Sequence, residues 1–251
     1  HLGTGNYNEE AALHYADLSY FTANRAVGDD VADLFNLLTG YTRSPQWQKL
    51  VVAPGEMRPR IVQEIEKTEA CARKGGRAKI IFKSNALIDT ETCKALCRAS
   101  QANVETVLLI RGACTLRLGL PGISDRIQVR MVVDRFLEHA RILYFQREDE
   151  ERVFVTSTDI MHRNFDWRVE VMLPVEDPAI KRRLIDEILA VELKDTAKSA
   201  HLTADGRYER TVPEGVSFRA QAHFMALARE RAHAEVSEPV VDIVDSIQQR
   251  A

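Results

Sequence analysis

Residues 78–112 read AKIIFKSNALIDTETCKALCRASQANVETVLLIRG, and this stretch decides the fold class. Two apolar runs rich in branched side chains, 78–83 and 104–111, predict strands. Between them, Asp89 stands where a helix N-cap is expected, ahead of a helix that reaches about Ser100. This alternation predicts an α/β fold with a largely parallel or mixed sheet. Arg111 and Gly112 follow the second strand, at the edge where open α/β sheets bind ligands.

The rest of the chain continues the alternation of strands and helices. In chain order, the spacing of apolar residues predicts a strand over 16–22, a helix over 27–38, a helix over 59–74, a hairpin of strands over 140–146 and 152–156, a strand over 168–173, and a helix over 179–193. A Pro-rich connection over 41–59 separates the first strand and helix from the rest. We therefore predict domains over 1–50 and 51–210, followed by a polar, helical tail over 211–251.

Composition narrows the classes of protein that fit. The 251 residues include 34 Lys and Arg against 37 Asp and Glu, which gives a net charge of −3 and no global basic field to gather nucleic acid. No apolar run approaches the roughly 18 to 20 residues that cross a bilayer, so we expect a cytoplasmic protein, with contact to the inner face of a membrane left open. The four cysteines form no C-x-x-C motif, which favours inert thiols over a metal site.

The chain resembles itself when it is shifted by 153 residues. Thr4-Gly5-Asn6 then falls on Ser157-Thr158-Asp159, and Ala16-Asp17-Leu18 falls on Val169-Glu170-Val171. Asn24 falls on Asp177, each ahead of an amphipathic helix. Each copy reads as a polar turn, a buried strand, a capping residue and a helix. A chance similarity between two strand–helix units is the open alternative. A true repeat predicts two related halves whose polar turns meet in one site.

A basic segment lies between residues 98 and 147. Its eight cations are all arginine, against four acidic residues, although the chain as a whole is negative. Arginine matches phosphate oxygens in pairs, so the segment favours phosphate recognition, and scattered ion pairs on a solvated face are the alternative.

His139 and Arg141 lie two positions apart at the entry to a predicted strand. Side chains at that spacing share one face, so an imidazole acid or base and a neutralising guanidinium can reach one phosphoryl group. His-x-Arg alone is more typical of a structural histidine, but the turn over 156–159 and Asn164 add polar groups nearby.

Several motifs together resemble the C-terminal half of bacterial polyphosphate kinases of the first type. The motifs are His1-Leu-Gly-Thr-Gly-Asn-Tyr-Asn8 with Tyr15, Leu109-Ile-Arg-Gly112, Gly122-Ile-Ser124, Arg135-Phe-Leu-Glu-His139-Ala-Arg141, Val155-Thr-Ser-Thr-Asp159-Ile-Met161 and Arg163-Asn164. The resemblance runs from His1 to about Tyr208. It implies a phospholipase D-like α/β fold made of two related units, the end of a first C-terminal domain and a complete second one.

The resemblance implies reversible transfer of the terminal phosphoryl group of ATP to inorganic polyphosphate, through a phosphohistidine and with Mg²⁺. Carried over, Tyr15, Arg111 and His139 contact the nucleotide, and His139 and Arg141 are catalytic. Supporting roles fall to Asn6, Asp159 and Asn164. The phosphorylated histidine and the Mg²⁺ ligands belong upstream of His1, so this chain alone should be inactive. The implied partners are ATP or ADP, polyphosphate and further copies of the chain in a dimer or tetramer.

Two other functions stay open. A phospholipase D-like phosphodiesterase or nuclease shares the fold and the paired histidine motifs, but prefers His-x-Lys where this chain has His139-x-Arg141. A non-catalytic module that binds ATP or polyphosphate is the third reading.

Overall fold

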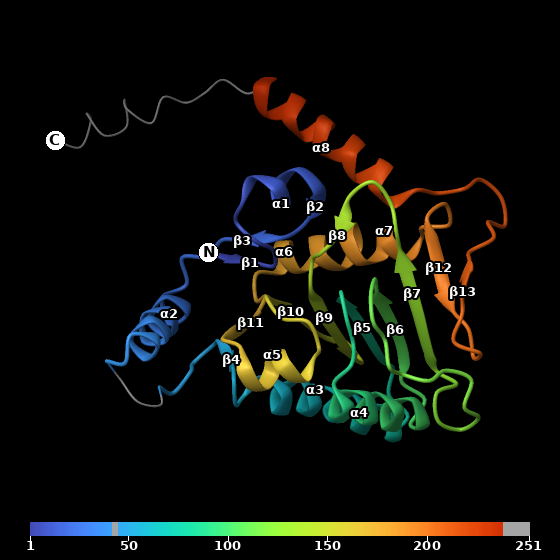
Figure 1. Cartoon of the computed structure of the whole chain (residues 1–251), viewed down its shortest axis with the longest axis horizontal. Coiled ribbons are helices and arrows are strands. Elements are labelled where there is room, and N and C mark those ends of the chain that lie inside the picture. The colour runs from blue at the N-terminus through green and yellow to red at the C-terminus, as the bar shows by residue number, and fades with distance from the viewer. Residues whose placement is uncertain (42–44, 238–251) are drawn as a thin grey trace.

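A computed structural model describes residues 1–41 and 45–237 of the chain. Its centre is a nine-stranded sheet with helices on both faces (Figure 1). Across the sheet, the strands are β13 (Tyr208–Arg210), β12 (Ser199–Leu202), β7 (Ile127–Val132), β6 (Glu105–Ile110), β5 (Ala78–Ser84), β9 (Ile142–Arg147), β10 (Glu150–Thr156), β11 (Glu170–Pro174) and β4 (Val51–Ala53). Strands β5, β6 and β7 run parallel and the other neighbours are antiparallel, so the predicted mixed sheet is confirmed.

The helices form two layers around this sheet. Helices α3 (Met57–Arg73) and α4 (Thr90–Gln101) cover one face (Figure 1). A continuous helix covers the other, made of α6 (Pro178–Arg182), a π-helical stretch η1 (Arg183–Leu189) and α7 (Ala190–Leu193). Two further helices, α5 (His162–Trp167) and α8 (Ala220–Ser237), follow β10 and β13 in the chain. The predicted βαβ unit is β5–α4–β6, and the Asp89 side chain caps α4 as expected.

Strand β5 explains why the sequence signal was an unbroken apolar run. Ile80 and Phe82 face the core cluster that contains α3 and α4, whereas Ile81 faces the cluster built on η1. All three side chains are at most 5% exposed. A strand buried on both faces has no polar alternation, which is typical of the parallel part of an α/β sheet.

The first residues form a separate small unit beside the sheet. It comprises β1 (Leu2–Gly3), α1 (Glu9–His14), β2 (Tyr15–Ala16), β3 (Ser19–Tyr20) and α2 (Arg25–Leu38), and β2 pairs with β8 (Leu137–Glu138). The single strand predicted over 16–22 is wrong, because β2 runs parallel to β8 while β3 pairs with β1, and the chain turns between them. The predicted helix over 27–38 is confirmed as α2, which Asn24 caps.

Some elements were not predicted. The connection over 41–59 contains β4 and the start of α3, and its residues 42–44 lie outside the described part of the chain. Strands β7, β12 and β13 were missed, since each is short or carries several polar residues. The helix expected in the tail is α8, and residues 238–251 lie outside the described residues.

The four cysteines are free. Burial raises the pKa of the Cys93 thiol to about 11, which keeps it protonated at neutral pH. Within residues 1–41 and 45–237, no three His, Cys, Asp or Glu side chains gather as a metal-ligand set. No helix in those ranges has the length and apolar character needed to span a bilayer.

Candidate functional site

The short parallel pair of β2 and β8 brings His139 to the first unit of the chain. Ala16 pairs with Glu138, and the backbone N–H of His139 donates to the Ala16 carbonyl at 3.0 Å. The rings of Tyr15 and His139 therefore lie beside each other, with centroids 5.0 Å apart. The two residue pairs between β2 and β8 thus bring Tyr15 and His139 together, although the two lie far apart in the sequence.

Both ring nitrogens of His139 have partners. Nδ1 lies 3.0 Å from Asp17 Oδ1, and Nε2 lies 3.1 Å from Nη2 of Arg141. The Asp17 carboxylate can only accept and the Arg141 guanidinium can only donate, so a neutral ring protonated on Nδ1 satisfies both contacts. The expectation that His139 and Arg141 share one face is confirmed. They lie in the extended segment between β8 and β9.

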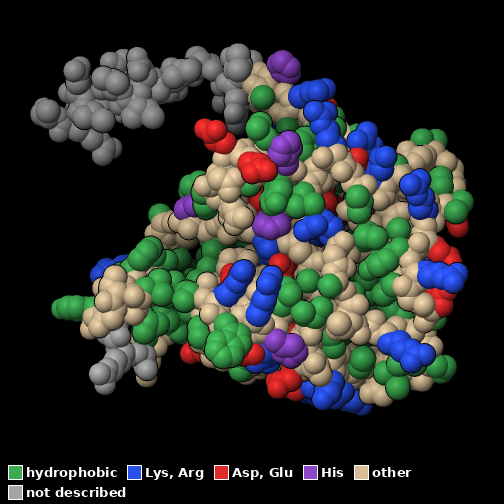
Figure 2. All heavy atoms as spheres, viewed as in Figure 1, with side chains coloured by type: hydrophobic (Ala, Val, Ile, Leu, Met, Phe, Trp, Pro, Cys, Tyr) green, Lys and Arg blue, Asp and Glu red, His purple; other side chains and the backbone are tan. Residues whose placement is uncertain are grey.

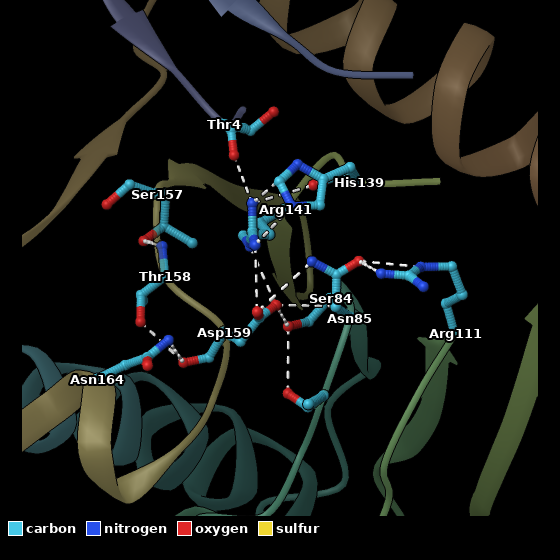
Figure 3. Close-up of polar contacts among 12 residues, drawn as sticks. Thr4, Ser84, Asn85, Arg111, His139, Arg141, Ser157, Thr158, Asp159 and Asn164 are labelled. Carbon is cyan, nitrogen blue, oxygen red and sulfur yellow. Dashed lines mark hydrogen bonds and ion pairs between the residues drawn. The ribbon is translucent and has the colours of Figure 1, made fainter. Parts of the chain in front are cut away.

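Arg141 joins the two polar turns of the repeat (Figure 3). Its Nε and Nη2 bind the Asp159 carboxylate at 3.0 and 3.1 Å, and its Nη1 donates to the Thr4 carbonyl. The side chain is only 8% exposed. These contacts occupy the guanidinium, so in this conformation Arg141 clamps the two turns and orients His139. Its expected catalytic role stays a prediction.

The two copies of the repeat make the same local contacts. In the first, the Thr4 hydroxyl donates to Asp17 at 2.7 Å and accepts from the Leu18 N–H at 2.9 Å. In the second, the Ser157 hydroxyl donates to Glu170 and accepts from the Val171 N–H at 3.1 Å. Asn24 and Asp177 then cap equivalent helices. This shared geometry favours a true repeat over a chance similarity, and its polar turns do meet.

Arg111 reaches the same site from the end of β6. Its Nη2 donates to Asn85 Oδ1 at 2.8 Å, and its Nε donates to the carbonyl of Glu138 at 3.0 Å, one residue before His139 (Figure 3). Gly112 allows this approach, because a Cβ there would lie 2.8 Å from the Asn85 carbonyl oxygen. The strand-end position predicted for Arg111 is thus adjacent to His139.

The remaining candidates lie around this centre. Asn164 is buried in α5 and donates to the Asp159 carbonyl at 3.3 Å, so it supports the second turn. Asn6 is exposed and lines a cavity of about 490 Å³ together with Tyr15 and Asp17. Gly5 borders the same carboxylate so closely that a Cβ would lie 1.9 Å from Asp17 Oδ2. The structure brings Asn6 to the cavity and not to the Arg141 clamp.

Both carboxylates of the site are held in the charged form. Burial opposes ionisation of Asp17, but hydrogen bonds from His139 and Thr4 outweigh it and lower its pKa. Burial likewise opposes ionisation of Asp159, and the Arg141 guanidinium with the Asn85 N–H and the Ser84 hydroxyl lowers its pKa. Each carboxylate is a fixed anion that orients a cationic or donating neighbour.

We expect Asp17→Asn to loosen the ring of His139 and shift its tautomer, because an amide carries no charge and can turn its NH2 group toward Nδ1. The ¹⁵N chemical shifts of the two imidazole nitrogens, measured by NMR, would report this change. Asp29→Asn is the control, since Asp29 is an exposed residue of α2 and its ion pair with Arg25 is 3.9 Å long. Equal His139 shifts in both variants would contradict the role given to Asp17.

The rest of the basic segment is mostly structural. Arg98 pairs with Glu66 and Arg147 with Glu64, while Arg130 donates to the carbonyl groups of Leu193 and Asp195. Figure 2 shows basic and acidic side chains interspersed over the visible face. The interpretation of scattered ion pairs therefore holds for Arg98 and Arg147. Arg130 binds backbone carbonyls instead, and Arg111 and Arg141 belong to the site.

Sequence reasoning missed three residues of the site. Asp17 was seen only as part of the repeat, where its alignment with Glu170 was a usable sign of two equivalent carboxylates. Ser84 and Asn85 end β5 and donate to Asp159 at 3.0 and 2.9 Å. The rule that directed attention to Arg111 at the end of β6 applies equally to the end of β5.

The fold and the site define a class of protein: a duplicated α/β protein in which two polar turns meet at an Arg–Asp–His centre. The chain belongs to the polyphosphate kinase family. Residues 50–221 match the family described as polyphosphate kinase C-terminal domain 2, and residues 1–44 match polyphosphate kinase C-terminal domain 1.

Individual relatives agree with this assignment. Polyphosphate kinase from Thermosynechococcus vestitus is 44% identical over 91% of this chain and 31% of its own length. The polyphosphate kinase of Mycolicibacterium gilvum is 42% identical over 93% of this chain and 31% of its own length. The crystal structure of polyphosphate kinase from Porphyromonas gingivalis superposes with a TM-score of 0.87 at 34% identity, over 93% of this chain and 36% of that one. The expected α/β fold is confirmed, and the chain spans about a third of the curated relatives it matches.

Proposed function

We propose that the full-length protein is a polyphosphate kinase that reversibly transfers the terminal phosphoryl group of ATP to inorganic polyphosphate. The observation that carries this proposal is the convergence of both polar turns on Arg141, beside the His139–Asp17 pair. Family membership supports the reaction, and because the chain spans only 31% of a curated relative, we assign the activity to a longer protein. ATP and ADP, polyphosphate and further copies of the chain are its proposed partners, in the cytoplasm where ATP is available.

We place the phosphorylated histidine upstream of His1. The repeat supports this, since Glu170 stands in the second copy where Asp17 stands in the first, and Asp17 binds His139. A histidine equivalent to His139 would lie 153 residues earlier, before the start of this chain. In the proposed step, its ring nitrogen bonds to the γ-phosphorus as the bond to the ADP oxygen breaks. The terminal oxygen of polyphosphate then takes the phosphoryl group and the histidine is released.

Within this chain, His139 acts on the transferring group as acid, base or hydrogen-bond donor. For this, Nε2 gives up its contact with Arg141, takes a proton and donates it toward a phosphate oxygen. Tyr15, beside His139 and lining the cavity, packs against the nucleotide base. Arg111 binds phosphate at the strand end. The two polar turns are held together by the contacts of Arg141, Asp159 and Asn164. Asn6 lines the cavity beside Tyr15 and supports the site from there.

Mg²⁺ is part of the proposed reaction, but the residues of this chain do not fit a resident Mg²⁺ site. In the part of the chain that the structure describes, no group of three ligand side chains is present. The two carboxylates of the site are already engaged, Asp17 by His139 and Asp159 by Arg141. We therefore assign the protein ligands of Mg²⁺ to the upstream part of the enzyme.

An assay of two activities tests this proposal. The full-length protein is incubated with ATP and Mg²⁺ and assayed for acid-insoluble polymer, and in parallel with a phosphodiester substrate. Polymer without diester cleavage is expected. Diester cleavage without polymer would replace the kinase with a phosphodiesterase, and ATP binding with neither product would leave only a binding module.

A further inference from the structure

A buried network of charged side chains includes Glu138, the residue that precedes His139. Lys83 of β5 binds Glu138 of β8 at 2.8 Å and Glu192 of α7 at 2.7 Å. The three side chains are 5%, 8% and 3% exposed. Two carboxylates share one ammonium, and burial with the nearby Glu138 charge raises the pKa of Glu192 to about 7, against the attraction of Lys83.

Helix α8 adds a fourth member to this network. Gln221 accepts from the Phe136 N–H at 2.9 Å and donates to the Phe136 carbonyl at 2.8 Å. Its amide also donates to Glu138 Oε1 at 2.6 Å. Gln221 is 2% exposed, so these bonds are shielded from water. The first turn of α8 is therefore fastened to the segment that carries His139.

The segment needs such support because its backbone pairing is slight. Among the described residues, β8 pairs with the two residues of β2 and is not part of the nine-stranded sheet. Lys83, by contrast, lies in β5 at the centre of that sheet. The Lys83–Glu138 contact thus ties a weakly paired strand to the central strand of the nine-stranded sheet. Arg111 depends on the same strand, since it donates to the Glu138 carbonyl.

A gain in stability does not account for this network. Buried ion pairs carry a desolvation cost that their attraction often fails to exceed, and well-packed apolar side chains can replace them without loss. Hydrogen bonds are directional, and apolar contacts are not, so the network fixes the register of β8 in a way that an apolar cluster would not. A displacement of about 1 Å at a reacting group can lower a rate by about 10²-fold.

We propose that Lys83, Glu138, Glu192 and Gln221 are positioning residues that hold His139 and Arg111 in reacting geometry, and that α8 is thereby part of the active-site support. The proposal rests on the proposed function and deepens it. It assigns no direct contact with substrate to the four residues. It also gives a role to the first turn of α8, a segment that sequence analysis treated as a polar tail.

Two variants test the proposal in the full-length enzyme. Glu138→Gln keeps the side-chain volume and removes the anion, and Gln221→Ala removes the link to α8 while leaving the three charged groups in place. For each we expect kcat to fall about 10- to 100-fold with little change in KM for ATP. Glu64→Gln is the control, because Glu64 is a buried carboxylate paired with Arg147 at 2.8 Å on α3 and contacts no residue of the site. It should lower the melting temperature without lowering kcat.

The possible outcomes distinguish failure of the positioning role from failure of the proposed function. Activity of both variants within about twofold of the parent, or a fall no larger than that of Glu64→Gln, would overturn the positioning role. If Glu138→Gln does not fold, Gln221→Ala decides. A parent enzyme that forms no polymer would instead overturn the proposed function. A parent that does form polymer, with fully active variants, would overturn this inference alone.

Discussion

Replacement of His139 with alanine in the full-length enzyme is expected to lower turnover by about 10²- to 10⁴-fold, the range typical of lost acid–base catalysis. The side chain contributes little to the core, since its contacts are with Asp17, Arg141 and the Tyr15 ring. The folded state should therefore survive. Initial rates of polymer formation and a thermal melt, measured on the same preparation, separate catalysis from stability.

His201→Ala is the matched control for that variant. His201 lies on β12, its side chain is 49% exposed, and its ion pair with Glu209 is 3.8 Å long. It should retain parental turnover. If His139→Ala also retained near-parental turnover, His139 would have no part in the mechanism, whatever its position between the two halves.

Removal of Arg141 is expected to have the largest effect on stability. Arg141→Ala leaves the Asp159 carboxylate, 15% exposed, without its guanidinium partner and also breaks the contact with Thr4. Breaking a buried pair in this way typically costs about 3–5 kcal/mol. Because the clamp also orients His139, turnover should fall together with stability. Unfolding of the parent and the variant in denaturant measures the loss of stability.

The pH dependence of stability gives an independent check on the same pair. The pKa of Asp159 in the folded protein lies below its ordinary value of 3.8, so the pair contributes fully above that value. Its contribution is lost as the pH falls through the lower folded pKa. The difference in stability between parent and Arg141→Ala should thus shrink in acid. A difference that stays constant to low pH would contradict the assigned interaction.

An exposed ion pair serves as the control for Arg141. Arg182 and Glu151 contact each other near the surface, with side chains 49% and 25% exposed. Pairs of this kind contribute about 0–1 kcal/mol. Arg182→Ala should therefore change stability far less than Arg141→Ala. Equal losses in the free energy of unfolding would mean that the Arg141 clamp stabilises the fold no more than the exposed pair does.

The predictability of the fold from sequence depended on how each element is stabilised. Strand β5 was recognised because burial on both faces leaves an unbroken apolar run, and α4 was recognised by its cap at Asp89. Strands β2 and β8 have two residues each, too few for any period. They form only because they pair with each other, although more than a hundred residues separate them in the chain. A pairing over that separation leaves no pattern in the local sequence.

The same division applies to the site. His139, Arg141 and Arg111 were identified from strand ends and from the resemblance, and the structure brings all three within one group of contacts. The role of Arg141 could not be foreseen, since only the folded chain shows that Asp159 and Thr4 occupy its guanidinium. Gln221 was likewise hidden, because a glutamine in a polar helix carries no signal until its buried partners are known.

We propose that the repeat builds one phosphoryl-transfer site from two halves. Incubation of the full-length enzyme with γ-labelled ATP and Mg²⁺, with the label followed into protein and polymer, tests this proposal. We expect an acid-labile, base-stable protein phosphate on a histidine upstream of His1, and labelled polymer that is lost in His139→Ala. Label on no histidine, or polymer formation unchanged in His139→Ala, would contradict it.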